Sequence, residues 1–285
     1  MLPISSILLS CHYNETITVG TTNFTETFIL GNIYSQLIEE NTDIQVEKKS
    51  NLNGSTIAFS ALENGAVDMF VEYTGTALAN LLHQPLNTDP DEVYAIVKEQ
   101  MLSEHGIYTS APLGFNNTYV MSVKRETAEK YGLSQLSDLQ GKAGLLRLGC
   151  TVEFSQRADS LPKMQREYGI RFKSVKGLEG NIRYQAIAAG EVEITDAFST
   201  DALLKKMELV TLEDDLHFFP PYYAVNFIRA DTMQEYPELK PLLAKMNGLI
   251  DEKTMMEMNY MVDVEGLDSK KVARDFLVRN GLIPR

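Results

Sequence analysis

Short apolar runs alternate with helical patterns along the first part of the chain. Residues 17–19 have the character of a strand, and apolar side chains recur over 29–38 with the spacing of one helix face. Two more strands are predicted at 44–47 and 67–72, with a helix over 57–62 between them. Strands and helices that alternate over such short connections predict parallel βαβ units.

A second round of alternation begins near residue 120. The elements it predicts are strands at 118–123, 145–148, 192–198 and 223–228, and helices at 125–131, 160–168, 181–189, 200–206, 237–247, 251–262 and 268–280. No internal repeat and no low-complexity linker separates the two rounds. We therefore expect two α/β lobes joined by more than one crossing of the chain. The ligand cleft is expected between them, because ligands of open α/β sheets bind at the carboxyl ends of the strands.

Polar residues mark two helix starts. Asn23-Phe-Thr-Glu26 has the spacing of a capping box, with Asn23 as the N-cap and Glu26 reaching back to it. Asn53-Gly54-Ser55 predicts a turn and cap before the next helix.

Composition narrows the possible functions. The chain has 285 residues, of which 44% are hydrophobic and 23% charged, as in a globular protein with one large domain or two ordinary ones. A net charge of −13 argues against a nucleic-acid partner, which would need a basic surface. The sequence has no apolar run of about 18 residues that would span a bilayer. Cys11 and Cys150 are too few for a disulfide framework or a four-ligand zinc site.

The first residues resemble part of a targeting signal. Leu8-Leu9-Ser10-Cys11 is similar to the end of a bacterial lipoprotein signal, in which the cysteine becomes lipidated, but the basic start of such a signal is missing. A truncated start, a fragment that follows a membrane domain and an accidental match are the alternatives. Residues 1–16 are assigned to a signal or anchor remnant or a linker.

Common enzyme signatures are missing from the sequence. It contains no G-x-S-x-G, G-x-x-x-x-G-K-[ST], H-E-x-x-H or C-x-x-C pattern. The four histidines lie far apart and are predicted to be surface or packing residues. We therefore expect a protein that is not an enzyme, with no cofactor and no metal site.

Several aromatic residues lie at predicted strand ends or lobe crossings, beside glycine, threonine or proline. They are Tyr73, Tyr119, Phe198, Tyr222 and Tyr223. Four ring faces in one cleft would form a box for a quaternary ammonium, which has no N–H to donate. Each ring contributes about 0.5–2 kcal/mol when the cation is desolvated. Taken singly, each ring is more readily explained as a core residue.

Five motifs occur in an order that resembles the substrate-binding proteins of osmoprotectant ABC transporters, which take glycine betaine, carnitine or choline. They are Val19-Gly-Thr-Thr-Asn-Phe-Thr-Glu26, Glu72-Tyr-Thr-Gly-Thr76, Asn117-Thr-Tyr119, Asp196-Ala-Phe-Ser-Thr-Asp201 and Phe218-Phe-Pro-Pro-Tyr222. The resemblance implies a bilobal type II periplasmic-binding fold, α/β in class, with two crossing segments. It also implies an aromatic cage for trimethylammonium. We expect lobe 1 to hold 17–118 plus 224–285, and lobe 2 to hold 119–223.

The resemblance extends to individual cage positions. Tyr73, Tyr119 and Tyr222 match the cage tyrosines of the family. Phe198 stands where the family usually has tyrosine, so this ring keeps its face but lacks the hydroxyl.

The resemblance also implies polar contacts to the ligand. Thr76 matches a position that bonds the polar end of the ligand, and Arg157 matches the arginine that clamps the carboxylate in betaine binders, which implies a zwitterion. The family often has Ser-Lys where this chain has Thr21-Thr22, so a second cation is missing. The other polar contacts are expected from Thr22, Ser55, Thr56 and Asn117.

These departures from the family pattern favour a bulkier ligand than glycine betaine. Carnitine is one such trimethylammonium zwitterion, and ergothioneine is another, since related binding domains, some fused to their permease, recognise it. Arg183-Tyr184 is expected either to contact such a longer ligand or to form a surface pair at a helix start.

The function that follows is ligand capture outside the cytoplasm, at the cell surface or in the periplasm. The lobes would close by hinge motion near Tyr119–Val120 and Pro221–Tyr223, and the closed form would dock on a membrane permease driven by an ATPase. Anchoring is expected through a lipid or through fusion to the permease. One alternative is a ligand-sensing receptor ectodomain with the same two lobes. Another is an enzyme related to porphobilinogen deaminase, for which Cys150 is the only candidate attachment residue, although a small core residue is its simpler role.

Overall fold

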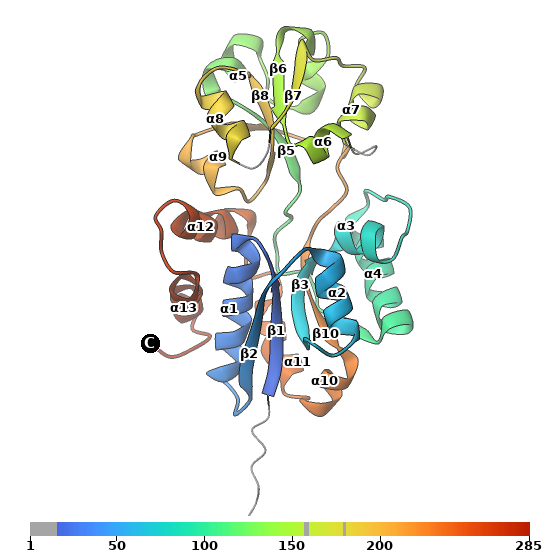
Figure 1. Ribbon diagram of the computed structural model, residues 1–285, viewed down its shortest axis with the longest axis vertical. Coiled ribbons are helices and arrows are strands. Elements are labelled where there is room, and N and C mark those ends of the chain that lie inside the picture. The colour runs from blue at the N-terminus through green and yellow to red at the C-terminus, as the bar shows by residue number, and fades with distance from the viewer. Residues whose placement is uncertain (1–15, 157–159, 179–180) are drawn as a thin grey trace, which may run out of the picture.

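The computed structural model describes residues 16–156, 160–178 and 181–285. They form two α/β lobes stacked along the long axis of the molecule, each built on a five-stranded sheet (Figure 1). Separate clusters of buried apolar side chains fill the two lobes. The bilobal α/β fold predicted from the sequence is therefore confirmed. Leu8–Cys11, in which the lipoprotein pattern occurs, lies outside the described residues.

The first sheet lies in the lower lobe of Figure 1. Its spatial order is β2 (Gln45–Leu52), β1 (Thr16–Thr22), β3 (Met69–Tyr73), β10 (Ala224–Arg229) and β4 (Ile107–Thr109). The helices of this lobe are α1 (Thr25–Glu39), α2 (Ser55–Glu63), α3 (Thr74–Thr76), η1 (Ala77–Leu81), α4 (Pro90–His105), α10 (Ala230–Glu235), α11 (Leu239–Leu243), η4 (Ala244–Met246), α12 (Glu252–Asp263) and α13 (Ser269–Arg279). One core joins α1 to α11, α12 and α13, and a second core joins α2, η1 and α4.

The second sheet lies in the upper lobe. Its spatial order is β7 (Ser174–Gly177), β6 (Arg147–Cys150), β8 (Ile194–Phe198), β5 (Tyr119–Val123) and β9 (Val210–Leu212). Its helices are α5 (Arg125–Tyr131), η2 (Leu136–Leu139), η3 (Ala143–Leu145), α6 (Val152–Gln156), α7 (Leu161–Glu167), α8 (Ile182–Ala188) and α9 (Ala202–Lys206).

Two segments connect the lobes side by side. The chain passes from β4 to β5 through 110–118 and returns from β9 to β10 through 213–223. Asn116 and Tyr223 form an antiparallel bridge between these segments. Asn116 Oδ1 also accepts the backbone N–H of Tyr222 at 2.7 Å, and the backbone N–H of Asn117 donates to the Tyr222 carbonyl at 3.0 Å. The two crossings therefore form a hydrogen-bonded pair.

The parallel units predicted for the first part of the chain are confirmed, and the crossings make both sheets mixed. β1 is parallel to β2 and β3, and β6 is parallel to β7 and β8. β10 runs antiparallel to β3 and β4, and β5 runs antiparallel to β8 and β9. The physical reason is that β5 and β10 each follow a crossing. They enter their lobe from the cleft, whereas β1, β3, β6 and β8 run toward it.

Most of the predicted elements are present within a few residues of their expected positions. The structure also contains elements that the apolar pattern did not predict, among them α4, α6, α10 and the strands β4, β7 and β9. Helix α4 is the largest of these. The Asp89 carboxylate accepts the backbone N–H groups of Asp91 and Glu92, Pro90 occupies the first turn, and Gly106 ends the helix at a φ of 65°.

A third contact joins the lobes beside the crossings. Helix α9 of the second lobe packs near α12 of the first (Figure 1). Asn259 Nδ2 on α12 donates to the backbone carbonyl of Thr200 at 3.1 Å, just before α9. Lys205 Nζ lies 3.9 Å from a Glu257 carboxylate oxygen and 4.9 Å from the centre of the Tyr260 ring.

Candidate functional site

A cavity of about 800 Å³ lies between the two lobes. It is lined by the residues that follow the carboxyl ends of β1 and β3 in one lobe and β6 and β8 in the other, together with both crossings. This is where a doubly wound α/β architecture is expected to bind a ligand. The volume is in the upper part of the range for small-molecule sites, roughly 300–1,000 Å³.

Seven of the eight ligand-binding residues predicted from the sequence line this one cavity. They are Thr22, Tyr73, Thr76, Asn117, Tyr119, Phe198 and Tyr222. The eighth, Arg157, lies outside the described residues. Of the other polar residues expected to contact the ligand, Ser55 lines the cavity, whereas Thr56 is not part of its lining.

The aromatic residues come from both lobes. In the second lobe the Tyr119 and Phe198 rings lie 4.7 Å apart between centres, because the two residues are directly paired across β5 and β8. In the first lobe the Tyr73 ring has a neighbour that the sequence analysis missed, Phe24, at 6.3 Å and an interplanar angle of 28°. Phe24 also lines the cavity and is 40% exposed, which is unusual for so large an apolar side chain.

Gly75 allows the close approach of a further ring. A Cβ atom at this position would lie 2.9 Å from atoms of the Tyr222 ring and 2.7 Å from the Pro221 carbonyl oxygen. Any residue larger than glycine would therefore push the second crossing and its tyrosine away from α3. This contact explains why glycine stands in the Glu72-Tyr-Thr-Gly-Thr76 motif.

Glu26 is the centre of the polar network in the first lobe. Its carboxylate accepts hydrogen bonds from the Tyr73 hydroxyl at 2.5 Å, from Asn117 Nδ2 at 2.9 Å and from Asn259 Nδ2 at 3.0 Å. The side chain is 2% exposed and lines the cavity. Burial raises the pKa of this carboxyl, and hydrogen bonds from Tyr73, Thr200, Asn259 and Asn117 act in the opposite direction.

The capping box predicted for α1 is therefore wrong. The N-cap residue is Phe24 rather than Asn23, and no side chain caps the helix. Glu26 turns toward the cavity because Tyr73, Asn117 and Asn259 offer it three donors there, whereas a capping box offers one backbone N–H.

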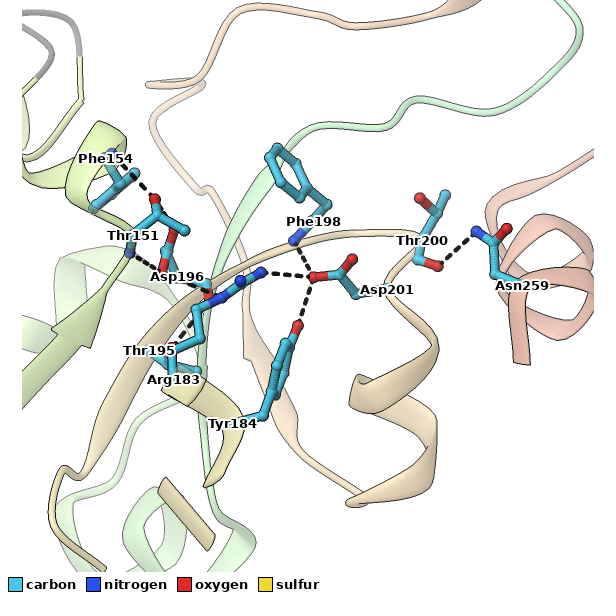
Figure 2. Close-up of polar contacts among 10 residues, drawn as sticks. All are labelled: Thr151, Phe154, Arg183, Tyr184, Thr195, Asp196, Phe198, Thr200, Asp201 and Asn259. Atoms are coloured by element: carbon cyan, nitrogen blue, oxygen red, sulfur yellow. Dashed lines mark hydrogen bonds and ion pairs between the residues drawn. The ribbon is translucent and has the colours of Figure 1, made fainter. Parts of the chain in front are cut away.

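A second network holds the end of β8 (Figure 2). Asp201 Oδ2 accepts from Arg183 Nη2 at 3.0 Å, from the Tyr184 hydroxyl at 2.5 Å and from the backbone N–H of Phe198 at 3.1 Å. Arg183 Nε also donates to the Asp196 carbonyl at 2.9 Å. Because the same carboxylate binds Arg183 and the Phe198 backbone, this network fixes the strand end that carries the Phe198 ring.

Arg183 and Tyr184 are therefore not a surface pair. Their exposed fractions are 5% and 3%, and both residues line the cavity. Burial raises the pKa of Tyr184, and the Asp201 carboxylate raises it further. Burial also raises the pKa of Asp196, while the Arg183 guanidinium opposes this rise. Arg183 thus lies between two carboxyls that compensate its charge.

Carboxyl side chains outnumber basic ones in the described part of the cavity wall. The acidic residues are Glu26, Glu72, Glu153, Asp201 and Asp263, and the basic one is Arg183. Such a wall attracts positive charge in a region where water screens it poorly.

Glu72 adds a pH dependence to the fold. Burial raises the pKa of this 2%-exposed carboxyl from 4.5 to about 7, with the Ser55 hydroxyl and the Tyr73 backbone N–H acting against the rise. Folding therefore favours the protonated form, and the folded state loses stability as the pH rises from 4.5 to about 7. The difference corresponds to about 3 kcal/mol.

The variant Glu72→Gln, which cannot ionise, tests this pH dependence. As the pH rises from 5 to 8, the wild type should lose about 3 kcal/mol more of its free energy of unfolding than Glu72→Gln does, as measured by urea denaturation.

Glu99→Gln makes the same charge change on the exposed face of α4 and should keep the wild-type pH dependence. Equal pH dependence of the wild type and Glu72→Gln would contradict the assignment.

The structure gives little support to covalent catalysis. Cys150 is buried in the second lobe, and burial raises the pKa of its thiol to about 12, so it is protonated at neutral pH. The porphobilinogen deaminase alternative thus lacks a reactive thiolate at this position. Within 16–156, 160–178 and 181–285, three or more potential metal ligands do not come together anywhere. Over the same residues, no helix combines the length and apolarity that crossing a bilayer requires.

Comparison with known proteins shows the family of the chain. A family model described as the substrate-binding domain of an ABC-type glycine betaine transport system matches residues 15–279. The ergothioneine transport permease/ergothioneine binding protein EgtU of Helicobacter pylori (strain G27) is 34% identical over 267 residues, which is 93% of this chain and 48% of that protein. This chain thus spans about half the length of that relative.

Two further proteins are similar over most of their own length. The carnitine transport binding protein OpuCC of Listeria monocytogenes serotype 1/2a (strain 10403S) is 32% identical over 268 residues, covering 93% of this chain and 87% of that protein. A solved structure described as a glycine betaine/carnitine/choline ABC transporter superimposes with a TM-score of 0.89 at 30% identity. It covers 93% of this chain and 99% of its own. These relatives are transport proteins rather than enzymes.

Proposed function

The chain belongs to the family of substrate-binding domains of ABC-type glycine betaine transport systems, and from this premise we propose that it captures a trimethylammonium zwitterion of the betaine, carnitine or ergothioneine type. One observation carries the proposal. Tyr73, Tyr119, Phe198 and Tyr222, contributed by both lobes and by a crossing, line a single cavity. The four rings would surround the methylated nitrogen of the ligand.

The chemistry of such a ligand fits the cavity wall. A quaternary nitrogen cannot donate a hydrogen bond, so it depends on ring faces and on nearby negative charge. Each ring contributes about 0.5–2 kcal/mol once water is excluded. The acidic residues of the wall add a favourable field for the cation. The ligand carboxylate is assigned to Arg157, and this assignment stays a prediction.

Capture would require the lobes to open and close. The bonded pair of crossings offers the hinge, as in other two-lobed proteins that close around a ligand. Closure would exclude water from the rings and strengthen their attraction for the cation. We further propose that the closed form delivers its ligand, outside the cytoplasm, to a membrane permease powered by an ATPase. Membrane attachment through a lipid or through fusion to the permease belongs to the same proposal.

Isothermal titration calorimetry against a ligand panel tests this function. The panel contains glycine betaine, carnitine, choline, proline betaine and ergothioneine. At least one should bind with a Kd below about 100 μM, or roughly −5.5 kcal/mol. If choline binds, 3,3-dimethylbutan-1-ol serves as its control, because it has the same shape with a neutral carbon in place of the charged nitrogen. Its affinity should be lower than that of choline. A panel in which nothing binds at 100 μM would contradict the proposal.

A further inference from the structure

Three acceptor oxygens around the cavity make no hydrogen bond of standard geometry with the described residues, although the Ser55 hydroxyl is near enough to lower the pKa of the Glu72 carboxyl. They are Glu72 Oε2, Asn117 Oδ1 and Asn259 Oδ1, all buried. The three residues line the cavity. Buried acceptors without a donor are costly, and an observed group of them calls for an explanation.

Glu26 fixes the orientation of two of these acceptors. Asn117 and Asn259 both donate their Nδ2 groups to the Glu26 carboxylate. Asn259 Nδ2 additionally donates to the Thr200 carbonyl. Since each amide nitrogen is held in this way, neither amide can turn over to offer its N–H groups instead. The network therefore presents oxygens, and only oxygens, at these two positions.

Glu72 provides the strongest of the three acceptors. It lies at the carboxyl end of the buried strand β3, beside the polar lining residues Ser55, Thr76 and Asn80. The backbone N–H of Tyr73 donates to Glu72 Oε1 at 2.8 Å, which occupies that oxygen and leaves Oε2. A hydrogen bond to an ionised oxygen in a buried site is about twice as strong as one between neutral groups.

We propose that the cavity selects quaternary amines that also carry an N–H or O–H donor, and that Glu72 Oε2 is the principal acceptor of that donor. The inference rests on the proposed function, because the rings must hold the trimethylammonium for the donor to be positioned. Trimethylammonium and carboxylate groups supply no such donor. Betaines without a hydroxyl or a ring N–H would therefore bring no donor to these three oxygens.

Two matched ligand pairs test the inference. γ-Butyrobetaine differs from carnitine only by lacking the hydroxyl, and ethyltrimethylammonium differs from choline in the same way. Calorimetry is performed at pH 8, where Glu72 is ionised, on the wild type and on Glu72→Gln. In Glu72→Gln, the amide oxygen can accept the hydrogen bond from the Tyr73 backbone N–H, which leaves the NH₂ group, a donor, at the place of the acceptor Oε2. In at least one pair, the wild type should prefer the hydroxylated ligand by about tenfold or more. Glu72→Gln should reduce this preference to below threefold.

The donor-free member of each pair shows whether Glu72→Gln keeps a working cavity: it should still bind, and its affinity should fall by less than that of its hydroxylated partner, because it loses only the field of the carboxylate. Glu99→Gln should keep the wild-type preference. No preference in either pair, or a preference that survives in Glu72→Gln, overturns the inference while leaving the proposed function intact. If the wild type binds none of the four ligands and none of the wider panel, the proposed function fails, and this inference fails with it.

Discussion

Tyr73→Ala should lower the affinity for a trimethylammonium ligand by about 30-fold or more. The substitution removes a ring face worth about 2 kcal/mol in a desolvated site. It also removes the hydroxyl that donates to Glu26 and the neighbour of the Phe24 ring. Both losses loosen the first-lobe side of the cavity. Calorimetry with the tightest ligand of the panel measures the effect.

Tyr73→Phe separates the two contributions. It keeps the ring face and deletes the donor to Glu26, so its affinity should lie closer to the wild type than that of Tyr73→Ala. Tyr94→Ala, on α4 and outside the cavity lining, should leave the affinity within about twofold. If Tyr73→Ala binds as tightly as the wild type, the ring does not contact the ligand and the cage is wrong.

Glu26→Ala should destabilise the folded protein by about 3 kcal/mol at pH 7. The Tyr73 hydroxyl, Asn117 Nδ2 and Asn259 Nδ2 would lose their shared acceptor, although Asn259 Nδ2 would keep the Thr200 carbonyl. Each buried donor left alone costs about 1–3 kcal/mol. Part of this cost is offset, because the desolvation that raises the pKa of Glu26 disappears with the carboxyl. Urea denaturation followed by circular dichroism gives the free energy of unfolding.

Glu26→Gln provides the matched comparison. Its oxygen can still accept from Tyr73 and Asn117, while its NH₂ would face Asn259 Nδ2. Turning the Asn259 amide would relieve that clash but would take the donor away from the Thr200 carbonyl. The loss should therefore be intermediate. A loss below about 1 kcal/mol for Glu26→Ala, or equal losses for the two variants, would show that the three bonds do not act together.

The placement of the cavity was predictable because it depends on strand direction. Tyr73 and Phe198 end strands that run toward the cleft, and Tyr119 begins the strand that leaves it. Residues at these places lie close together in a fold with two such sheets. The order of the motifs along the sequence was therefore enough to predict that they line one cavity. The ligand-binding roles of these residues await the experiments above.

The roles of Glu26 and Arg183 could not be predicted in the same way. Glu26 lies 47, 91 and 233 positions from its three partners. Its spacing to Asn23 predicted a capping box instead, and that prediction was wrong. Arg183 likewise binds Asp201, 18 positions away on another element. These are tertiary contacts between short polar segments, and no local periodicity encodes them.

Helix α4 is a different case, because its signals were present. Asp89-Pro90 and Gly106 are the usual start and end of a helix, and three buried residues, Val93, Val97 and Met101, recur at a spacing of four. The strands β4 and β9 have three residues each, too few for an alternation to be detected.

The contact between α9 and α12 has a kinetic consequence for any ligand held in the cavity. Rotation about the paired crossings would separate Asn259 from Thr200, and Lys205 from Glu257 and Tyr260, before the ligand could leave. The energy of this contact would thus be part of the barrier to escape. The residence time of the ligand would respond to changes at Lys205, Glu257 and Tyr260, which do not line the cavity.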